Sequence, residues 1–383
     1  MRCNVADDGT INAFYGQSGY KEDGSNGQVM VYQPKFYYSR IPTDLEGNNI
    51  GYKIRKEIIT LSPDYKPGFK VHPAFINDDG QEVDYILYSA YEGSAYLTDQ
   101  NAYDSDDSSN INFSKDKLSS ISSVRPISGR NKEFTRTSAE QMANNRGTGW
   151  HIDNMVTLSA NQMLEMIELG YLNTQHAVES GVVNLNDNSN ASVTGSTSAL
   201  GNSTGYAPEG TINISNSGTT TYNENGKRAI SYRGIENPWG NIWKFITRAA
   251  VIGNGQQAGG VIRVCNNYTY SSTEVYTYPS TDINITNTKG YASSFGYNNN
   301  EFDYIFIPNE ANGNTSAPIG DKIWVYSSLN GDRMITNGGC FSSQQDAGAF
   351  AYACSESSTT HSERFGARLV YIPTKNSIHT ANV

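Results

Sequence analysis

The stretch Gly234–Phe245, GIENPWGNIWKF, is the most distinctive part of the chain, and two shorter runs follow it. They are Asn337–Phe341, NGGCF, and Phe365–Pro373, FGARLVYIP. Large aromatic side chains bury wide apolar areas, so we expect Trp239 and Trp243 to anchor a core. All three runs therefore indicate a scaffold that the remaining chain is built around.

Small and charged residues of these runs also point to structural roles. The Gly338-Gly339 pair suits a close backbone approach or a positive φ. Arg368 lies between apolar residues of an expected strand, so its guanidinium needs a buried carboxylate or backbone carbonyls as partners. The residues to which we assign structural roles are Trp239, Asn241, Trp243, Gly338, Gly339, Gly366 and Arg368.

Short segments rich in β-branched and aromatic residues predict strands on both sides of the first run. They cover residues 28–40, 51–61, 83–91, 261–265, 304–307, 322–326 and 368–372, and regular structure is also expected over 229–245. Two capping-box patterns, Ser138–Gln141 and Ser159–Gln162, predict two helices. The first should end near Gly147, and Gly170 stands where a C-cap belongs after the second. Short strands with long loops and two helices are typical of an α+β domain.

Polar stretches suggest how this domain is organised. Residues 101–123 and 184–226 are rich in Ser, Asn, Asp and Thr, and we expect both to be surface loop insertions. Residues 1–27 form a short N-terminal segment that could dock against a main domain spanning 28–375. Residues 376–383 are expected to be a tail.

Composition limits the possible partners. The chain has 383 residues and a formal net charge of -10, which argues against nucleic acid because phosphates need clustered cations. It lacks 18 consecutive apolar residues, so no membrane insertion is expected. The first 19 residues lack the pattern of a secretory signal, so synthesis in the cytoplasm without a signal peptide is expected. The four cysteines (Cys3, Cys265, Cys340 and Cys354) have no metal-like spacing and are expected to be free, although a Cys340–Cys354 bridge stays open.

In their order and spacing, the three runs resemble the C-type-lectin-fold family that contains the formylglycine-generating enzymes. They are most similar to its branch of phage tail and diversity-generating-retroelement variable proteins. Upstream segments, including VMVYQPKFYYS at 29–39, extend the resemblance over about residues 28–373. The resemblance implies an α+β C-type lectin fold made of short antiparallel strands, two helices and long loops. It also implies a homotrimer located on a virion.

Catalytic patterns are missing from the chain. Formylglycine-generating enzymes that use oxygen carry two copper-binding cysteines after the G-G motif, and the matching positions here are Ser343 and Gly348. The five histidines are scattered, with no H-E-x-x-H pattern, nucleophile elbow or phosphate-binding loop. Asp78, Asp79 and Asp84 offer too few ligands for a calcium loop. We therefore expect no catalysis, no metal and no cofactor.

With catalytic and metal-binding patterns missing, we expect the chain to act through a binding surface. In the phage branch, the stretch between the G-G motif and the closing strand contacts ligand and is often hypervariable, and here it is 338–366. Its small polar and aromatic residues are typical of adaptable binding surfaces. Tyrosines of 266–280 form a second candidate, although they could instead cover an apolar edge or a subunit interface. The candidate ligand-binding residues are Phe341, Ser342, Ser343, Gln344, Gln345, Asp346, Phe350, Tyr352, Cys354, Glu356, Thr359, His361, Tyr268 and Tyr270.

These features together predict a phage tail fibre or tail-tip protein that recognises a host-surface glycan or protein without catalysis. Its other partners would be virion tail proteins. Two alternatives remain. One is a structural virion or baseplate protein with no receptor role, and the other is an oxidase of the formylglycine-generating type. The oxidase would need a metal and a reactive thiol.

Overall fold

The computed structural model describes residues 1–42, 54–62, 64–65, 67–185, 190–208, 210–215, 218–222, 226–253, 260–265, 275–297, 301–326 and 330–374. Over these residues the chain is mostly β, with many short strands and three α-helices, of which the longest has 15 residues. The prediction of an α+β C-type lectin fold is therefore wrong. It rested on two helices and three short runs, whereas strand pairing organises most of the described chain.

A six-stranded antiparallel sheet joins the two ends of the described chain. Its order is β11 (Trp150–Ile152), β27 (Leu369–Tyr371), β7 (Tyr85–Ser89), β3 (Gln28–Pro34), β1 (Arg2–Val5) and β2 (Ile11–Phe14). Because β1 pairs with both β2 and β3, the first residues are part of this sheet. The run FGARLVYIP supplies β27, between β11 and β7.

An eight-stranded sheet is built around β17. Along its main path lie β19 (Ser280–Asn284), β18 (Val261–Val264), β17 (Trp243–Ile252), β24 (Asp332–Gly338), β25 (Gly348–Ala353), β23 (Lys322–Trp324) and β20 (Gly290–Tyr291). β26 (Phe365–Gly366) pairs with β17 in parallel. Nine of the ten residues of β17 are buried, including Lys244, Thr247 and Arg248, as expected for a strand with neighbours on both sides.

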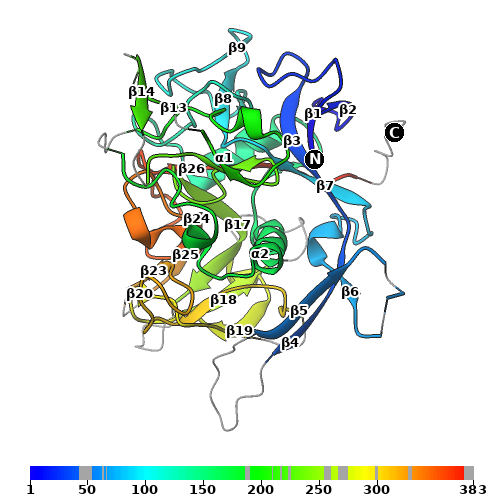
Figure 1. Ribbon diagram of the computed structural model, residues 1–383, viewed down its shortest axis with the longest axis vertical. Helices are drawn as coiled ribbons and strands as arrows, with labels where there is room; N and C mark the ends of the chain where they lie inside the picture. The colour runs from blue at the N-terminus through cyan, green and yellow to red at the C-terminus, as the bar shows by residue number, and fades with distance from the viewer. Residues whose placement is uncertain are drawn as a thin grey trace.

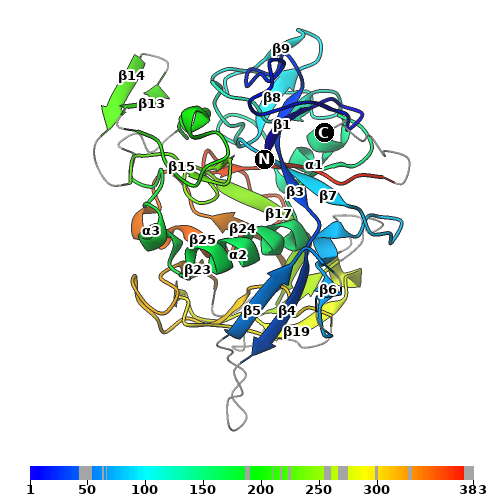
Figure 2. The same ribbon diagram turned by 45° about the vertical axis from the view of Figure 1, so that its right-hand side comes forward.

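Smaller sheets surround these two (Figure 1). The three-stranded ones are β10 (Lys117–Ser119) with β8 (Ser94–Leu97) and β9 (Ala102–Tyr103), β5 (Ile54–Thr60) with β4 (Tyr37–Pro42) and β6 (Lys70–Val71), and β12 (Gly205–Tyr206) with β15 (Ile230–Tyr232) and β16 (Ile235–Glu236). The two-stranded ones are β13 (Gly210–Ser215) with β14 (Gly218–Tyr222), and β21 (Ser294–Phe295) with β22 (Pro308–Glu310). In both views β8 and β9 lie at the top and β19 and β23 lie in the lower half (Figure 2).

Both expected helices exist, but they begin earlier than predicted. α1 (Arg136–Asn144) has Thr135 as its N-cap, and Ser138 closes the capping box from the third helical position. α2 (Met155–Leu169) begins after the N-cap Asn154, so Ser159 lies inside the helix. Gly170 ends α2 in the left-handed conformation, as predicted. The short α3 (Thr174–Ala177) follows.

Several other expectations need correction. Residues 304–307 form no strand, although all four are buried. The segment 101–123 is not simply an exposed loop, because it contributes β9 and β10 and buries Leu118 and Ile121. Within the described part of 184–226, Ala191, Ser192 and Thr197 are also buried. Polar composition suggested surface loops, but these segments satisfy their polar groups internally.

Arg368 holds three distant segments together in the core. Its guanidinium donates to the backbone oxygens of Ser89, Glu236 and Asn237, the last at 2.8 Å. Only 1% of the residue is exposed. The expectation that a buried arginine here needs carbonyl partners is confirmed.

A second buried charge, the carboxylate of Glu92, organises the GIENPWGNIWKF run. Glu92 Oε2 accepts from Asn241 Nδ2 at 2.5 Å and from Asn237 Nδ2 at 3.3 Å, and Lys244 Nζ lies 3.7 Å from Oε1. Asn237 and Asn241 both have positive φ, which asparagine tolerates better than most residues. Asn241 also accepts from the Ser192 backbone N–H at 2.7 Å. The two asparagines of the run therefore form turns and also donate hydrogen bonds to Glu92.

Replacing Arg368 with Met should lower the free energy of unfolding by about 3 kcal/mol, because three buried carbonyls lose their donor. Urea unfolding of the purified variant measures this. Gln345→Ala, at an exposed position, is the control and should stay within about 0.5 kcal/mol of wild type. Equal stability of Arg368→Met and wild type would contradict this role for Arg368.

Candidate functional site: a surface around Trp324

Four of the predicted ligand-binding residues lie in the core. Phe341, Phe350 and Tyr352 are fully buried and Cys354 is 1% exposed. Phe350 and Tyr352 belong to β25, which lies inside the eight-stranded sheet with every residue buried. Its aromatic residues therefore pack internally and cannot contact a ligand in this structure.

The other predicted residues fall into three groups. Ser342, Ser343, Gln344, Gln345 and Asp346 are exposed or half-exposed and adjoin one another in the loop after the G-G motif. Glu356, Thr359 and His361 are also exposed or half-exposed, but a different part of the fold holds their segment: the Gly129 N–H donates to Ser362 O at 2.9 Å. Tyr268 and Tyr270 lie outside the described residues.

Hydrogen bonds fix the loop Cys340–Asp346 from several sides. Its backbone closes on itself, with the Ser343 N–H donating to Cys340 O at 2.9 Å. The Gln344 N–H donates to Val183 O at 2.8 Å, and Gln175 Nε2 donates to Gln344 O at 3.0 Å. The last turn, Gln344–Asp346, is a 3-10 helix. The loop thus presents its exposed side chains from a fixed backbone.

Asp346 links this loop to a tyrosine and a lysine of two paired strands. Tyr291 on β20 donates its hydroxyl to Asp346 Oδ1 at 2.6 Å, and Lys322 on β23 bonds Oδ2 at 2.8 Å. Tyr291 and Lys322 lie opposite each other in the pair. Cross-strand partners project to the same face, so both reach Asp346 together.

The indole of Trp324 completes the group. Lys289 Nζ lies 3.5 Å from its ring centroid and Lys322 Nζ lies 4.7 Å away, both suited to cation–π attraction. We name this group the Trp324 surface; it consists of Lys289, Tyr291, Lys322, Trp324, Gln344, Gln345 and Asp346. It combines amides, aromatic rings and charges of both signs.

Burial and the neighbouring Asp346 carboxylate raise the pKa of Tyr291 to about 12, so its hydroxyl stays protonated and remains a donor at neutral pH. The Lys322–Asp346 pair is partly shielded, with side-chain exposures of 19% and 17%. The arrangement suits recognition by stacking and hydrogen bonding.

Sequence reasoning missed Lys289, Tyr291, Lys322 and Trp324 as surface partners. A strand was predicted over 322–326, but no sequence signal pairs it with 290–291 or with the loop 342–346. Those contacts arise from the crossover that places β23 between β25 and β20. Only Tyr291 and Trp324, as half-exposed aromatic residues in a polar neighbourhood, carried a usable hint.

Groups with strongly shifted pKa often mark active sites, but three of them here, Glu165, Asp153 and Lys244, lie in the core. Burial raises the pKa of Glu165 to about 8 and that of Asp153 to about 6, and it lowers the pKa of Lys244. All four cysteines are buried and free, and burial raises the pKa of the Cys354 thiol. In this structure the Cys340–Cys354 bridge is not formed.

No helix among the described residues is long and apolar enough to cross a bilayer. No three or more His, Cys, Asp or Glu side chains gather there in a way that could hold a metal ion.

The chain was compared with protein-family models, curated proteins and solved structures. No family model and no curated protein matches the chain. Among solved structures, the chain is similar to the Major Tropism Determinant P3c variant, with 13% identity and a TM-score of 0.29 over 97% of this chain and 71% of that one.

The raised pKa of Glu165 predicts a pH-dependent stability. Folding lifts this pKa from an ordinary 4.5 to about 8, so the folded state holds a proton that the unfolded state releases. Stability should therefore fall as pH rises through this window. Glu165→Gln has no titrating group at this position. Its free energy of unfolding should therefore rise relative to that of wild type between about pH 5 and about pH 9.

Urea unfolding at several pH values measures this difference. Glu168→Gln is the matched control, because Glu168 lies on the same helix but at its surface, paired with Arg233. A gap between wild type and Glu165→Gln that stays constant with pH would contradict a protonated Glu165 in the folded chain.

Proposed function

We propose that the chain is a non-catalytic recognition protein of the phage-tail type, which binds a host-surface receptor through the Trp324 surface. The observation that carries the proposal is a fixed loop, Cys340–Asp346, whose exposed side chains border half-exposed aromatic rings. The order of the three sequence runs supports the phage context. A glycan or a protein receptor fits this chemistry.

The division between core and surface supports binding without reaction. Beneath the loop, Phe341 and Ala347 are buried, whereas Gln344 and Gln345 are exposed. Such a backbone tolerates changes at its exposed positions at small cost in stability. The proposal therefore includes sequence variation at these positions as a way to change receptor.

The proposal also places the protein on a virion, as a homotrimer in contact with other tail proteins. Several copies would raise the overall affinity of a weak single site through effective concentration. The rival oxidase lacks support, because Ser343 and Gly348 occupy the positions of its cysteine pair and the cysteines present are buried.

Fluorescently labelled protein should bind intact cells of at least one strain in a bacterial panel. Gln345→Arg should weaken this binding about tenfold or more, because a long charged side chain would stand on the contact surface; tenfold equals about 1.4 kcal/mol. Its matched control is Gln141→Arg, the same change at an exposed position of α1.

Two outcomes would count against the proposal. If Gln345→Arg and Gln141→Arg both bind like wild type, the Trp324 surface is not the contact. If no strain binds even a multivalent form of the protein, a structural virion role is favoured instead.

A further inference from the structure

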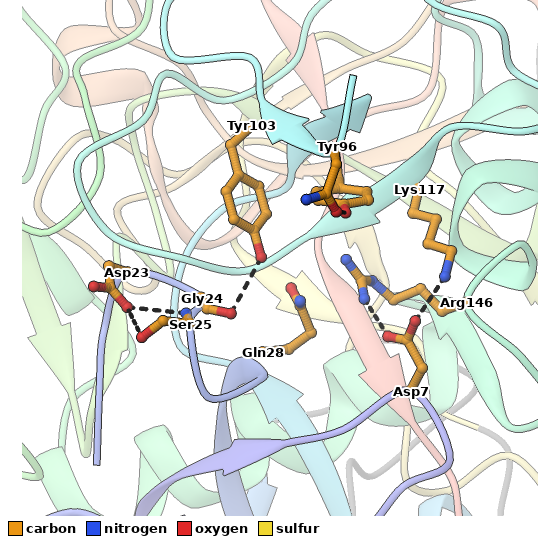
Figure 3. A pocket seen from close by; sticks show the side chains of 10 residues that line it. Asp7, Asp23, Gly24, Ser25, Gln28, Tyr96, Tyr103, Lys117 and Arg146 are labelled. Carbon is orange, nitrogen blue, oxygen red and sulfur yellow. Dashed lines mark hydrogen bonds and ion pairs between the residues drawn. The ribbon is translucent and has the colours of Figure 1, made fainter. Parts of the chain in front are cut away.

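A pocket of about 560 Å³ lies near the β8–β9 hairpin, away from the Trp324 surface (Figure 3). Small-molecule sites typically have volumes of roughly 300–1,000 Å³. The pocket combines residues from the N-terminal segment with residues of β8, β9 and β10 and one arginine that follows α1.

Strand register brings three of its residues onto one face. Tyr96 on β8 lies opposite Tyr103 on β9 and opposite Lys117 on β10. The two phenol rings meet edge to face, with centroids 5.1 Å apart. Both tyrosines are half-exposed, so they offer aromatic surface to a ligand.

The formal charges of the pocket cancel. Asp7 forms ion pairs with both Lys117, at 2.7 Å, and Arg146. Arg146 is buried, and its Nη2 also donates to Ser119 Oγ at 2.6 Å. The remaining acid, Asp23, accepts from the backbone and hydroxyl of Ser25, at 2.9 and 2.6 Å. An anionic ligand would meet cations that Asp7 already neutralises, and a cationic one would meet Lys117 and Arg146.

Uncharged hydrogen-bonding groups complete the wall. The Asn101 carboxamide oxygen accepts a hydrogen bond from the Tyr96 hydroxyl. The two N–H groups of Asn101 Nδ2 are then the part of this side chain that can bind a ligand. Asn101 adopts a positive φ of 49° at the hairpin turn. The Tyr103 hydroxyl reaches Gly24 O at 3.4 Å, which joins the N-terminal loop to the hairpin.

We propose that this pocket binds a neutral saccharide. Phenol rings contact the C–H faces of a sugar, while amide, hydroxyl and ion-paired groups bond its hydroxyls. A polar pocket favours a hydroxyl-rich ligand. An apolar ligand would cover the polar groups of the pocket and leave them without hydrogen-bond partners. The inference does not depend on the Trp324 surface being a receptor contact.

A printed array of neutral and acidic oligosaccharides, followed by calorimetry with the methyl glycoside of the best-binding sugar, tests the proposal. Neutral glycans should bind, and Tyr96→Ala should weaken binding about tenfold or more. Asn101→Gly is the second variant, because glycine accepts the positive φ and removes only the carboxamide. Tyr206→Ala, at an exposed tyrosine 44% accessible elsewhere in the fold, should bind like wild type.

Thermal melting first establishes that each variant is folded, and Asn101→Gly keeps the test open if Tyr96→Ala is not. The proposal is overturned if no neutral glycan binds at millimolar concentration, or if only sialylated or sulfated glycans bind. It is also overturned if folded Tyr96→Ala and Asn101→Gly bind as tightly as wild type. Gln345→Arg should leave the glycan affinity unchanged, which separates this pocket from the Trp324 surface.

Discussion

The buried guanidinium of Arg368 and the buried carboxylate of Glu92 are the constraint on which the rest of the structure depends. Arg368 joins the end of β7, the turn at 236–237 and the start of β27. Glu92 holds the two asparagines of the GIENPWGNIWKF run. Either charge would be costly in the core without its partners. The segments that supply these partners therefore hold one another in place.

Sequence patterns predicted the local parts of the fold and missed how they assemble. The strands of 28–40, 83–91 and 261–265, the C-cap Gly170 and the buried role of Trp239 were all readable from residue type. The C-type lectin fold was not correct, because short runs define local turns and leave strand order open. Sheet order depends on pairings between segments hundreds of residues apart, which residue type does not specify.

The candidate site shows the same limit at the level of single side chains. Polar residues of 342–346 were identified by composition, and they do lie at the surface. Phe350 and Tyr352 looked like exposed aromatic contacts because their neighbours are small, yet those small neighbours are themselves packed within a central strand. Lys289 and Trp324 could not be linked to the loop from sequence, because a crossover places them there.

The position of β27 in the six-stranded sheet has a consequence for synthesis. This strand comes last in the described chain but sits between β11 and β7, while β1 and β3 come first. On the ribosome, the edge of β7 that pairs with β27 stays open until residues 369–371 emerge. An unpaired edge invites association with other chains, so nascent molecules on one messenger are exposed to mispairing until β27 has been made. Pairing between segments so far apart in the chain also predicts slow folding.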